Sequence, residues 1–357
     1  MRALAASLGT GRARRLTAGL AGAGVLLIAV PAGAAVPRPD DEPAALEVLE
    51  RAARASWALP YSGTKFVAAW HPAGTSTSLV DVRNDPLRGT TMAASPTAAG
   101  GGDDGDDVLL VTASGLDGRL LQALVDSYSL RRADPGRCAG RTAEVVEAVR
   151  DGDVAGRFWV DRESGLLLRR EVYDDEGRRV RSSAFVDLLL GESGPPMADG
   201  TARRLPRELG RLVPLGRLAD MRDDGWHVPT ELPGGLRLFE ARTGAGDRDG
   251  RVLHLAYSDG LSTASLFVQS GTPGDRPPEG FVQRDVGGHA TWVRDGAPER
   301  VVWGGGGRVW TLVTDAPVND VDAVVAALPH DEPPDEGLRA RLARGLSRVG
   351  GWLNPFD

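Results

Sequence analysis

Alternating apolar and polar positions predict four consecutive strands in the middle of the chain. Residues 141–150 alternate loosely through valines, residues 157–161 read Arg-Phe-Trp-Val-Asp, and residues 166–173 and 180–190 continue the series. β-branched and aromatic residues favour strands, and the glycines between the runs favour tight turns. Because strands joined by hairpins pair antiparallel, we expect an antiparallel sheet over residues 140–191, with one face wet and one covering apolar residues.

Two stretches before this sheet have apolar residues at helical spacing. The first follows the acids of residues 40–42, which suit the positive end of a helix, and its apolar face comprises Leu46, Leu49, Ala53 and Trp57. The second has an apolar face comprising Leu116, Leu120, Leu121, Leu124 and Tyr128. Residues 62–70 lie between them as a predicted strand, with Phe66 and Trp70 on one side and Lys65 and Val67 on the other.

The periodic pattern stops between residues 191 and 210, where prolines, glycines and arginines leave no apolar face. We therefore predict a linker at 191–210 that separates a large domain, residues 40–190, from a smaller one, residues 211–330. The smaller domain is expected to be α+β and largely antiparallel, with strands at 236–241, 251–257, 263–269, 290–294, 300–303 and 309–314 and a closing helix from Val318 to Leu328. A length of 357 residues fits two domains.

The N-terminus resembles an export signal. Four arginines precede an uncharged stretch at residues 16–36, and Ala32-Gly33-Ala34 fits a cleavage site for a signal peptide spanning residues 1–35. An uncleaved anchor is the alternative, although Pro31 and several glycines weaken a membrane span. Cleavage would move the formal charge from −7 to −11. An acidic exported protein is a poor partner for nucleic acid.

Residues with catalytic or metal-binding chemistry are scattered. The five histidines stand singly, and the chain contains no HExxH, GxSxG, P-loop or CxxC motif. Cys138 is the single cysteine, and His254 lies inside an apolar strand, where we expect a hydrogen-bonded sheet residue. The aspartates of residues 98–107 lack the spacing of an EF-hand and indicate a solvated loop. We predict no enzymatic activity, no catalytic residues, no metal and no cofactor.

Several of these segments resemble the RseB/MucB family of extracytoplasmic regulators of stress sigma factors. The resemblance rests on Cys138 to Arg141, Phe158 to Leu166 and Asp174 to Gly177, and on the strand pair at residues 253–268. It implies an N-terminal LolA-like open β-barrel with helices, whose apolar cavity accepts acyl chains, and a smaller α+β domain. On that fold, the candidates for the cavity are Phe66, Trp70, Phe158 and Val160.

The resemblance also implies a function. Such a protein would bind the extracytoplasmic part of a membrane anti-sigma factor through its smaller domain, with Tyr257, Leu261 and Phe267 as candidate contacts. Binding would shield that partner from proteolysis, and a lipid-type ligand would release it. The alternative is a LolA-like carrier or sensor of lipid or lipoprotein without a sigma-factor role. Both would work in the cell envelope, outside the cytoplasmic membrane.

The last residues, 335–357, predict a basic amphipathic helix after Pro333-Pro334. Its leucines share one side, whereas Arg341, Arg344 and Arg348 occupy the opposite side, and Trp352 follows. Such a helix can dock on its own protein, or it can lie on an anionic membrane or on the membrane-bound partner.

Overall fold

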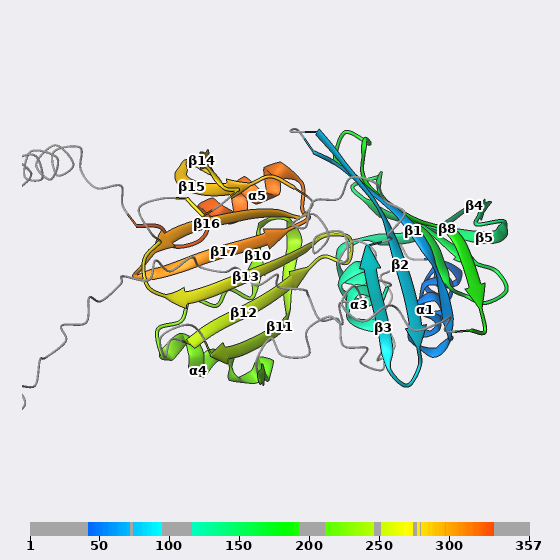
Figure 1. Cartoon of the computed structure of the whole chain (residues 1–357), viewed down its shortest axis with the longest axis horizontal. Helices are drawn as coiled ribbons and strands as arrows, with labels where there is room; N and C mark the ends of the chain where they lie inside the picture. The colour runs from blue at the N-terminus through cyan, green and yellow to red at the C-terminus, as the bar shows by residue number, and fades with distance from the viewer. Residues whose placement is uncertain are drawn as a thin grey trace, which may run out of the picture.

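The structure is a computed structural model that describes residues 42–71, 74–94, 116–192, 211–245, 251–273, 277–278, 280–296 and 298–331. Among these residues, two sheets are the main feature, and Figure 1 shows them side by side. The predicted α+β class is confirmed. The predicted linker falls between the last strand of the first sheet and the first strand of the second, and residues 193–210 lie outside the described part.

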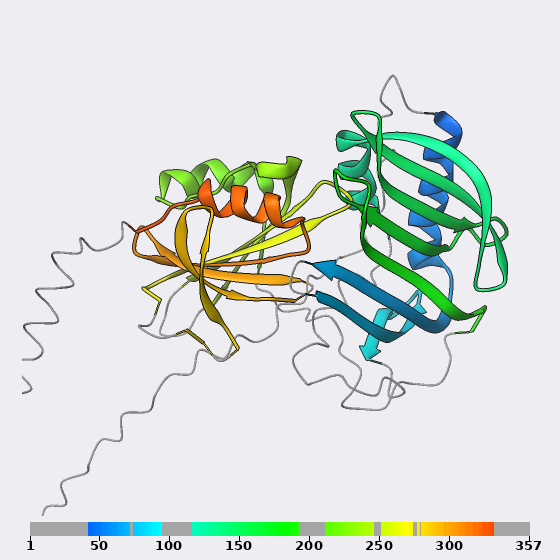
Figure 2. The same cartoon turned by 90° about the horizontal axis from the view of Figure 1, so that it is seen from above.

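The first sheet has the strand order β3-β2-β1-β8-β7-β6-β5-β4, and every neighbouring pair is antiparallel. Its strands are β1 (Tyr61–His71), β2 (Gly74–Asp85), β3 (Gly89–Ala94), β4 (Ser129–Cys138), β5 (Arg141–Arg150), β6 (Asp153–Asp161), β7 (Leu167–Tyr173) and β8 (Arg179–Leu190). Helices α1 (Pro43–Ala58) and α3 (Gly118–Ser127) pack against one face of this curved sheet (Figure 2). The Asp117 side chain caps α3 by accepting hydrogen bonds from the Arg119 and Leu120 amides.

Cross-strand pairing assigns side chains to the two faces of this sheet. Val67 pairs with Ser183, which pairs with Arg170, which pairs with Phe158. Directly paired residues project to the same side. Phe158 belongs to the core formed with α1 and α3, so this row defines the inner face, against which the helices pack.

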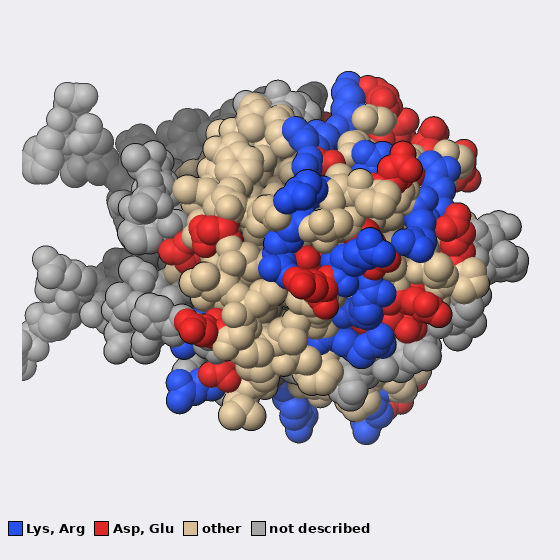
Figure 3. Space-filling model, turned by 90° about the vertical axis from the view of Figure 1, so that its right-hand side faces the viewer, with Lys and Arg blue, Asp and Glu red and all other residues tan. Residues whose placement is uncertain are grey.

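The outer face is defined by the neighbouring row, in which Phe66 pairs with Ala184, Ala184 with Arg169, and Arg169 with Trp159. Two buried carboxylates on this face, Glu147 and Glu171, accept hydrogen bonds from arginines on neighbouring strands. Figure 3 shows basic and acidic side chains intermixed on the side of the molecule formed by the large domain. The outer face therefore carries a network of ion pairs, while the inner face carries the apolar core shared with α1 and α3.

The second sheet follows the order β10-β11-β12-β13-β17-β16-β15-β14, and β9 pairs with β11. Its strands are β9 (Arg211–Val213), β10 (Glu231–Leu232), β11 (Leu236–Ala245), β12 (Arg251–Ser258), β13 (Thr263–Ser270), β14 (Val282–Val286), β15 (His289–Arg294), β16 (Glu299–Gly305) and β17 (Arg308–Thr314). Helices α4 (Leu218–Asp223) and α5 (Val318–Ala326) contribute to the core on one face, together with the short 3-10 turns η1 (Leu215–Arg217) and η2 (Pro233–Gly235) beside the sheet.

The elements predicted from strong periodicity are present, but several others were missed. The four central strands, both large-domain helices and the closing helix are confirmed within a few residues. Strands β2, β3, β4, β9, β10 and β14 and helix α4 were not predicted. In β4, for example, the alternation of apolar and polar residues is hidden by Arg131, Arg132, Asp134, Pro135 and Gly136. A register shift between Ala133 and Gly136 also interrupts the pairing of β4 with β5. Trp57, expected on the buried face of α1, is 45% exposed.

Candidate functional site

The turn Ser258–Ser262, between β12 and β13, is held by its own side chains. The Asp259 Oδ1 accepts hydrogen bonds from the Leu261 amide at 2.9 Å and the Ser262 amide at 2.6 Å. The Ser258 Oγ accepts from the Gly260 amide and donates to the Ser262 carbonyl at 2.7 Å. Short polar side chains that bond nearby amides fix a turn. We call this turn the junction loop, because it projects from the second domain into the first.

The tip of the junction loop enters the large domain. Gly260 has a φ of +91°, and a Cβ there would lie 2.4 Å from the backbone of Leu124 in α3. Leu261 is 1% exposed and belongs to the same core cluster as Phe158 and Val172. Gly156 lies so close that a Cβ there would be 2.5 Å from the Leu261 Cδ2. Burying one leucine contributes about 1.5–3 kcal/mol, so this side chain helps to join the domains.

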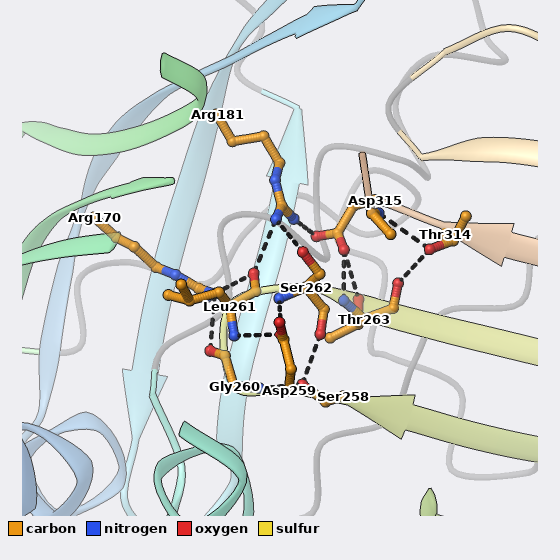
Figure 4. A network of polar contacts seen from close by, with 11 residues as sticks. Arg170, Arg181, Ser258, Asp259, Gly260, Leu261, Ser262, Thr263, Thr314 and Asp315 are labelled. Atoms are coloured by element: carbon orange, nitrogen blue, oxygen red, sulfur yellow. Dashed lines mark hydrogen bonds and ion pairs between the residues drawn. The ribbon is translucent and has the colours of Figure 1, made fainter. Parts of the chain in front are cut away.

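Two arginines of the inner face hold the junction loop by hydrogen bonds (Figure 4). The Arg170 Nη2 donates to the carbonyls of Gly260 at 3.1 Å and Leu261 at 2.6 Å. The Arg181 Nη2 donates to the Leu261 carbonyl and to the Ser262 Oγ, both at 2.9 Å. Arg181 also forms an ion pair with Asp315, just after β17, and the two side chains are only 6% and 7% exposed. The partners named here for both arginines come from the second domain.

Burial lowers the pKa values of the two arginines at this junction. Desolvation and the neighbouring Arg170 lower the pKa of Arg181 to about 9, and Asp259 opposes this change. Desolvation also lowers the pKa of Arg170. Arg181 stays charged at neutral pH, and a buried cation without an anion is strongly destabilising. The large domain therefore depends on the second domain to neutralise its inner face.

Further polar contacts surround the junction loop. The Tyr128 hydroxyl donates to the Asp259 Oδ2, which also pairs with Arg150 at 3.5 Å. The Arg150 guanidinium lies 4.2 Å from the centroid of the Tyr128 ring. Desolvation, followed by the charge of Asp259, raises the pKa of Tyr128, so the phenol stays protonated and remains a donor. An ion pair between Arg119 of α3 and Glu240 of β11, at 2.8 Å, extends the contact between the domains.

The four residues predicted to line an acyl cavity lie on two different faces. Phe158 and Val160 are on the inner face and fully buried, whereas Phe66, 39% exposed, and Trp70 belong to the outer face. The strand alternation was read correctly, but it does not say which side is covered. Here Lys65 points inward, with its Nζ 4.7 Å from the centroid of the Phe185 ring.

The residues predicted to contact a partner are also placed within the protein. Tyr257 is fully buried and donates to the Pro229 carbonyl at 2.9 Å, and Leu261 is enclosed by the large domain. Phe267 is partly buried and stacks on His254, with ring centroids 4.4 Å apart. Desolvation lowers the pKa of His254 to about 4. Neither of its ring nitrogens has a hydrogen-bond partner, unlike the hydrogen-bonded histidine that we expected.

The remaining candidates lie outside the described residues. They include the aspartate-rich stretch at residues 98–107 and the tail residues Arg341, Arg344, Arg348 and Trp352. Within the described ranges, no group of histidine, cysteine and acidic residues has the arrangement of a metal site. In those same ranges, no helix is long and apolar enough to cross a membrane.

Sequence reasoning missed Arg170, Arg181, Asp259 and Asp315. Their partners in the other domain lie some 80 to 130 residues away along the chain, so no local spacing reveals these contacts. The one available signal was the junction loop, because the series Ser-Asp-Gly-Leu-Ser suits a side-chain-capped turn with a glycine at positive φ.

Part of this chain matches a known protein family. A model described as the MucB/RseB N-terminal domain matches residues 111–208. The "Sigma-E factor regulatory protein RseB" of Haemophilus influenzae is 27% identical over 157 residues, which cover 43% of this chain and 48% of that protein. The match thus spans about half the length of this curated relative.

Solved structures also match this chain at low similarity. The crystal structure of MucB in complex with MucA(peri) has 18% sequence identity and a TM-score of 0.43, covering 80% of this chain and 99% of that one. The complex of Pseudomonas aeruginosa MucA/MucB has 19% identity and a TM-score of 0.45, covering 80% of this chain and 98% of that one.

Proposed function

From the similarity of part of this chain to the MucB/RseB family, we propose that the protein is an exported negative regulator of an envelope-stress sigma factor. It binds the extracytoplasmic part of a membrane anti-sigma factor and shields that partner from proteolysis. The observation that carries this proposal is the family match over residues 111–208, together with the name of the RseB relative. In this proposal the protein works outside the cytoplasmic membrane and performs no catalysis.

A two-domain chain supports this proposal over a plain lipid carrier. The LolA-like large domain alone would suffice for carrying a lipid, whereas here a second sheet is attached through a dedicated junction loop. We assign the surface for the anti-sigma factor mainly to the second domain, residues 211–330. A carrier or sensor without a sigma-factor role would retain lipid but ignore the anti-sigma factor.

The burial of Leu261 links partner binding to the relative position of the domains. A partner can reach Leu261 only after the junction loop has left the large domain, because that side chain is enclosed there, whereas Tyr257 is buried in the core of the second domain itself. A releasing ligand, of a lipid type, must bind the free regulator more tightly than the complexed one. The partner and the releasing ligand would both change the position of the junction loop.

A second contact with the membrane is proposed for residues 335–357. Arg341, Arg344 and Arg348 would attract anionic lipid, and Trp352 suits the interfacial region. Such a contact would keep the exported protein beside its membrane-bound partner.

The proposal is tested by direct binding. The exported form, lacking residues 1–35, is titrated with the purified extracytoplasmic segment of the single-span anti-sigma factor of the same organism. We expect a saturable complex of defined stoichiometry. A lack of binding, combined with retention of lipid, would favour the carrier function instead. Deletion of the gene should raise sigma-factor activity, measured with a reporter promoter.

A further inference from the structure

We infer that His289 and His330 form a proton-operated latch, which holds the segment Pro329–Asp331 on the second sheet at neutral pH and releases it when the surrounding solution turns acidic. We call this segment the C-terminal strap. The inference goes beyond the proposed function, because neither partner binding nor ligand release in that proposal depends on protons.

The C-terminal strap lies directly on the hairpin of β16 and β17. The Trp303 Nε1 donates to the Pro329 carbonyl at 3.0 Å, and the Asp331 amide donates to the Gly304 carbonyl at 3.0 Å. A Cβ added at Gly305 would clash with the Pro329 carbonyl oxygen, so the hairpin has a glycine where the strap crosses it. The strap is therefore closely fitted to the sheet.

The strap is far from the domain junction. In the pairing of β13 with β17, the turn between β16 and β17 lies beside Ser270, whereas the junction loop lies at the other end of β13, before Thr263. Figure 1 shows this hairpin turn on the side of the second sheet that faces away from the large domain. Release of the strap can therefore leave the junction loop in place while it changes the point from which the chain after Asp331 departs.

Two stacked imidazole rings join the strap to β15. The rings of His289, the first residue of β15, and His330 have centroids 3.5 Å apart and planes inclined by 2°. Trp303 also stacks on His330, with centroids 5.6 Å apart. The His330 Nε2 lies 2.6 Å from the Val325 carbonyl of α5, which can only accept, so this nitrogen carries a proton. The Nδ1 atom of the neutral ring is therefore the one that takes up a further proton.

Protonation of His330 opposes docking of the strap. Desolvation lowers the pKa of His330, the hydrogen bond to the Val325 carbonyl opposes this, and a charge on His289 lowers the pKa further, so the net change is downward from 6.5. A released strap regains the ordinary pKa and binds more protons than the docked one. The docked state therefore has its full stability above pH 6.5 and loses it as the pH falls toward the lower pKa of the docked ring.

Acidic groups on the elements around the latch can balance one proton. Within the strap, Asp331 raises the pKa of His330. In β14, the Asp285 carboxylate accepts a hydrogen bond from the turn that precedes His289. Helix α5 contacts the same turn through the Asp322 carbonyl, and the Asp322 side chain is exposed. A single proton on the histidine pair is thus placed near negative charge.

A second proton would place two cations face to face. With the ring centroids 3.5 Å apart, the two charges repel each other strongly, because the half-buried rings are only partly screened by water. Two groups that interact this closely lose their protons in two separate steps. We expect release of the strap to follow the second protonation of the pair.

Hydrogen exchange tests the latch in the exported form, which lacks residues 1–35. Exchange is followed by mass spectrometry at about pH 7.5 and about pH 5.5, on either side of the ordinary histidine pKa, and corrected for the intrinsic effect of pH. The peptide that contains Asp331 is expected to lose protection by at least about tenfold at the lower pH, since one linked proton changes an equilibrium about tenfold per pH unit. The peptide that contains Leu255 of β12 should keep its protection.

His289→Phe keeps a ring in the stack but removes the second protonation. Its Asp331 peptide is expected to have protection at about pH 5.5 within about twofold of that at about pH 7.5. His227→Phe is the matched control, because His227 contacts Trp310 in the same domain, with centroids 6.1 Å apart, but lies outside the strap. It should respond to pH as the unsubstituted protein does.

Three results would overturn the inference. The first is exchange of the Asp331 peptide that does not change with pH, and the second is an equal pH response in His289→Phe and His227→Phe. The third is a loss of protection shared by the Leu255 peptide, which would show unfolding of the domain. If His289→Phe does not fold, the unsubstituted protein still decides, because the latch requires the Asp331 peptide to respond while the Leu255 peptide does not.

Discussion

Gly260 is the residue on which the domain junction depends most directly. Its positive φ is open to glycine at little cost, and its missing side chain lets the junction loop touch the backbone of α3. The positive φ and the close contact with α3 each disfavour every residue other than glycine. Asp259 and Ser258 then hold the turn, so that Leu261 and its carbonyl are presented together.

Gly260→Ala is predicted to weaken docking of the junction loop. A Cβ at 2.4 Å from Leu124 forces the loop away, so the loss of stability should exceed the cost of positive φ alone, about 1–2 kcal/mol. Gly177→Ala is the control, because Gly177 has a φ of +73° and a Cβ added there would meet no atom within 4 Å. Thermal unfolding of both variants measures the difference. Equal losses would contradict a tight contact at Gly260.

The ladder of ion pairs across β4 to β8 stabilises the outer face at the scale of the sheet. Glu171, 3% exposed, accepts hydrogen bonds from the Tyr173 hydroxyl at 2.6 Å and from Arg179 at 2.7 Å, and it also pairs with Arg169. Burial raises the pKa of Glu171, but these hydrogen bonds outweigh it, so the net change is downward from 4.5. A carboxylate with a depressed pKa stabilises the fold above its unfolded pKa, and this contribution is lost as the pH falls.

Glu171→Gln is therefore predicted to destabilise the protein at pH 7, by about 1–3 kcal/mol. The deficit should shrink as the pH falls below about 4.5, because the unfolded chain of the unsubstituted protein then takes up a proton that folded Glu171, with its lower pKa, does not yet bind. Glu163→Gln should have little effect, because the Glu163 side chain is 85% exposed although it pairs with Arg141. Urea unfolding at several pH values measures this. A deficit that does not change with pH would show that shape, not charge, determines the role of Glu171.

The same elements show what the sequence could predict. Runs such as β6 and β7 were predictable because valines, leucines and aromatics alternate between clear turns. Strand β2 was missed because serines and threonines fill its first half. The face of β1 was ambiguous for a different reason: Lys65 is buried beside Phe185, while Phe66 is exposed. Only the fold of the whole sheet determines which side of such a strand is covered.

At the scale of the whole molecule, the junction joins residues that no sequence window contains. Arg181 and Asp315 are paired across the two domains, and Asp259 is close to Arg150 of β5. The sequence identified the junction loop as a feature of the family but assigned it to a partner. In the structure the junction loop packs into the large domain. Whether a partner can reach Leu261 therefore depends on how the two domains are positioned.

The tail belongs to the same scale, because its proposed role concerns where the whole protein is held. Deletion of residues 335–357 is predicted to abolish binding to vesicles that contain anionic lipid while leaving the melting temperature unchanged. Co-sedimentation and calorimetry measure the two quantities. Unchanged vesicle binding with a large loss of stability would show instead that the tail docks on its own protein.

The central claim is that this chain protects an anti-sigma factor from proteolysis, and cleavage of that partner tests it most directly. The purified extracytoplasmic segment is incubated with the site-one protease of the same organism, with and without an excess of the exported form. We predict that the exported form slows cleavage in proportion to the fraction of segment bound. Cleavage at the same rate, under conditions in which the two proteins are shown to be complexed, would contradict the claim.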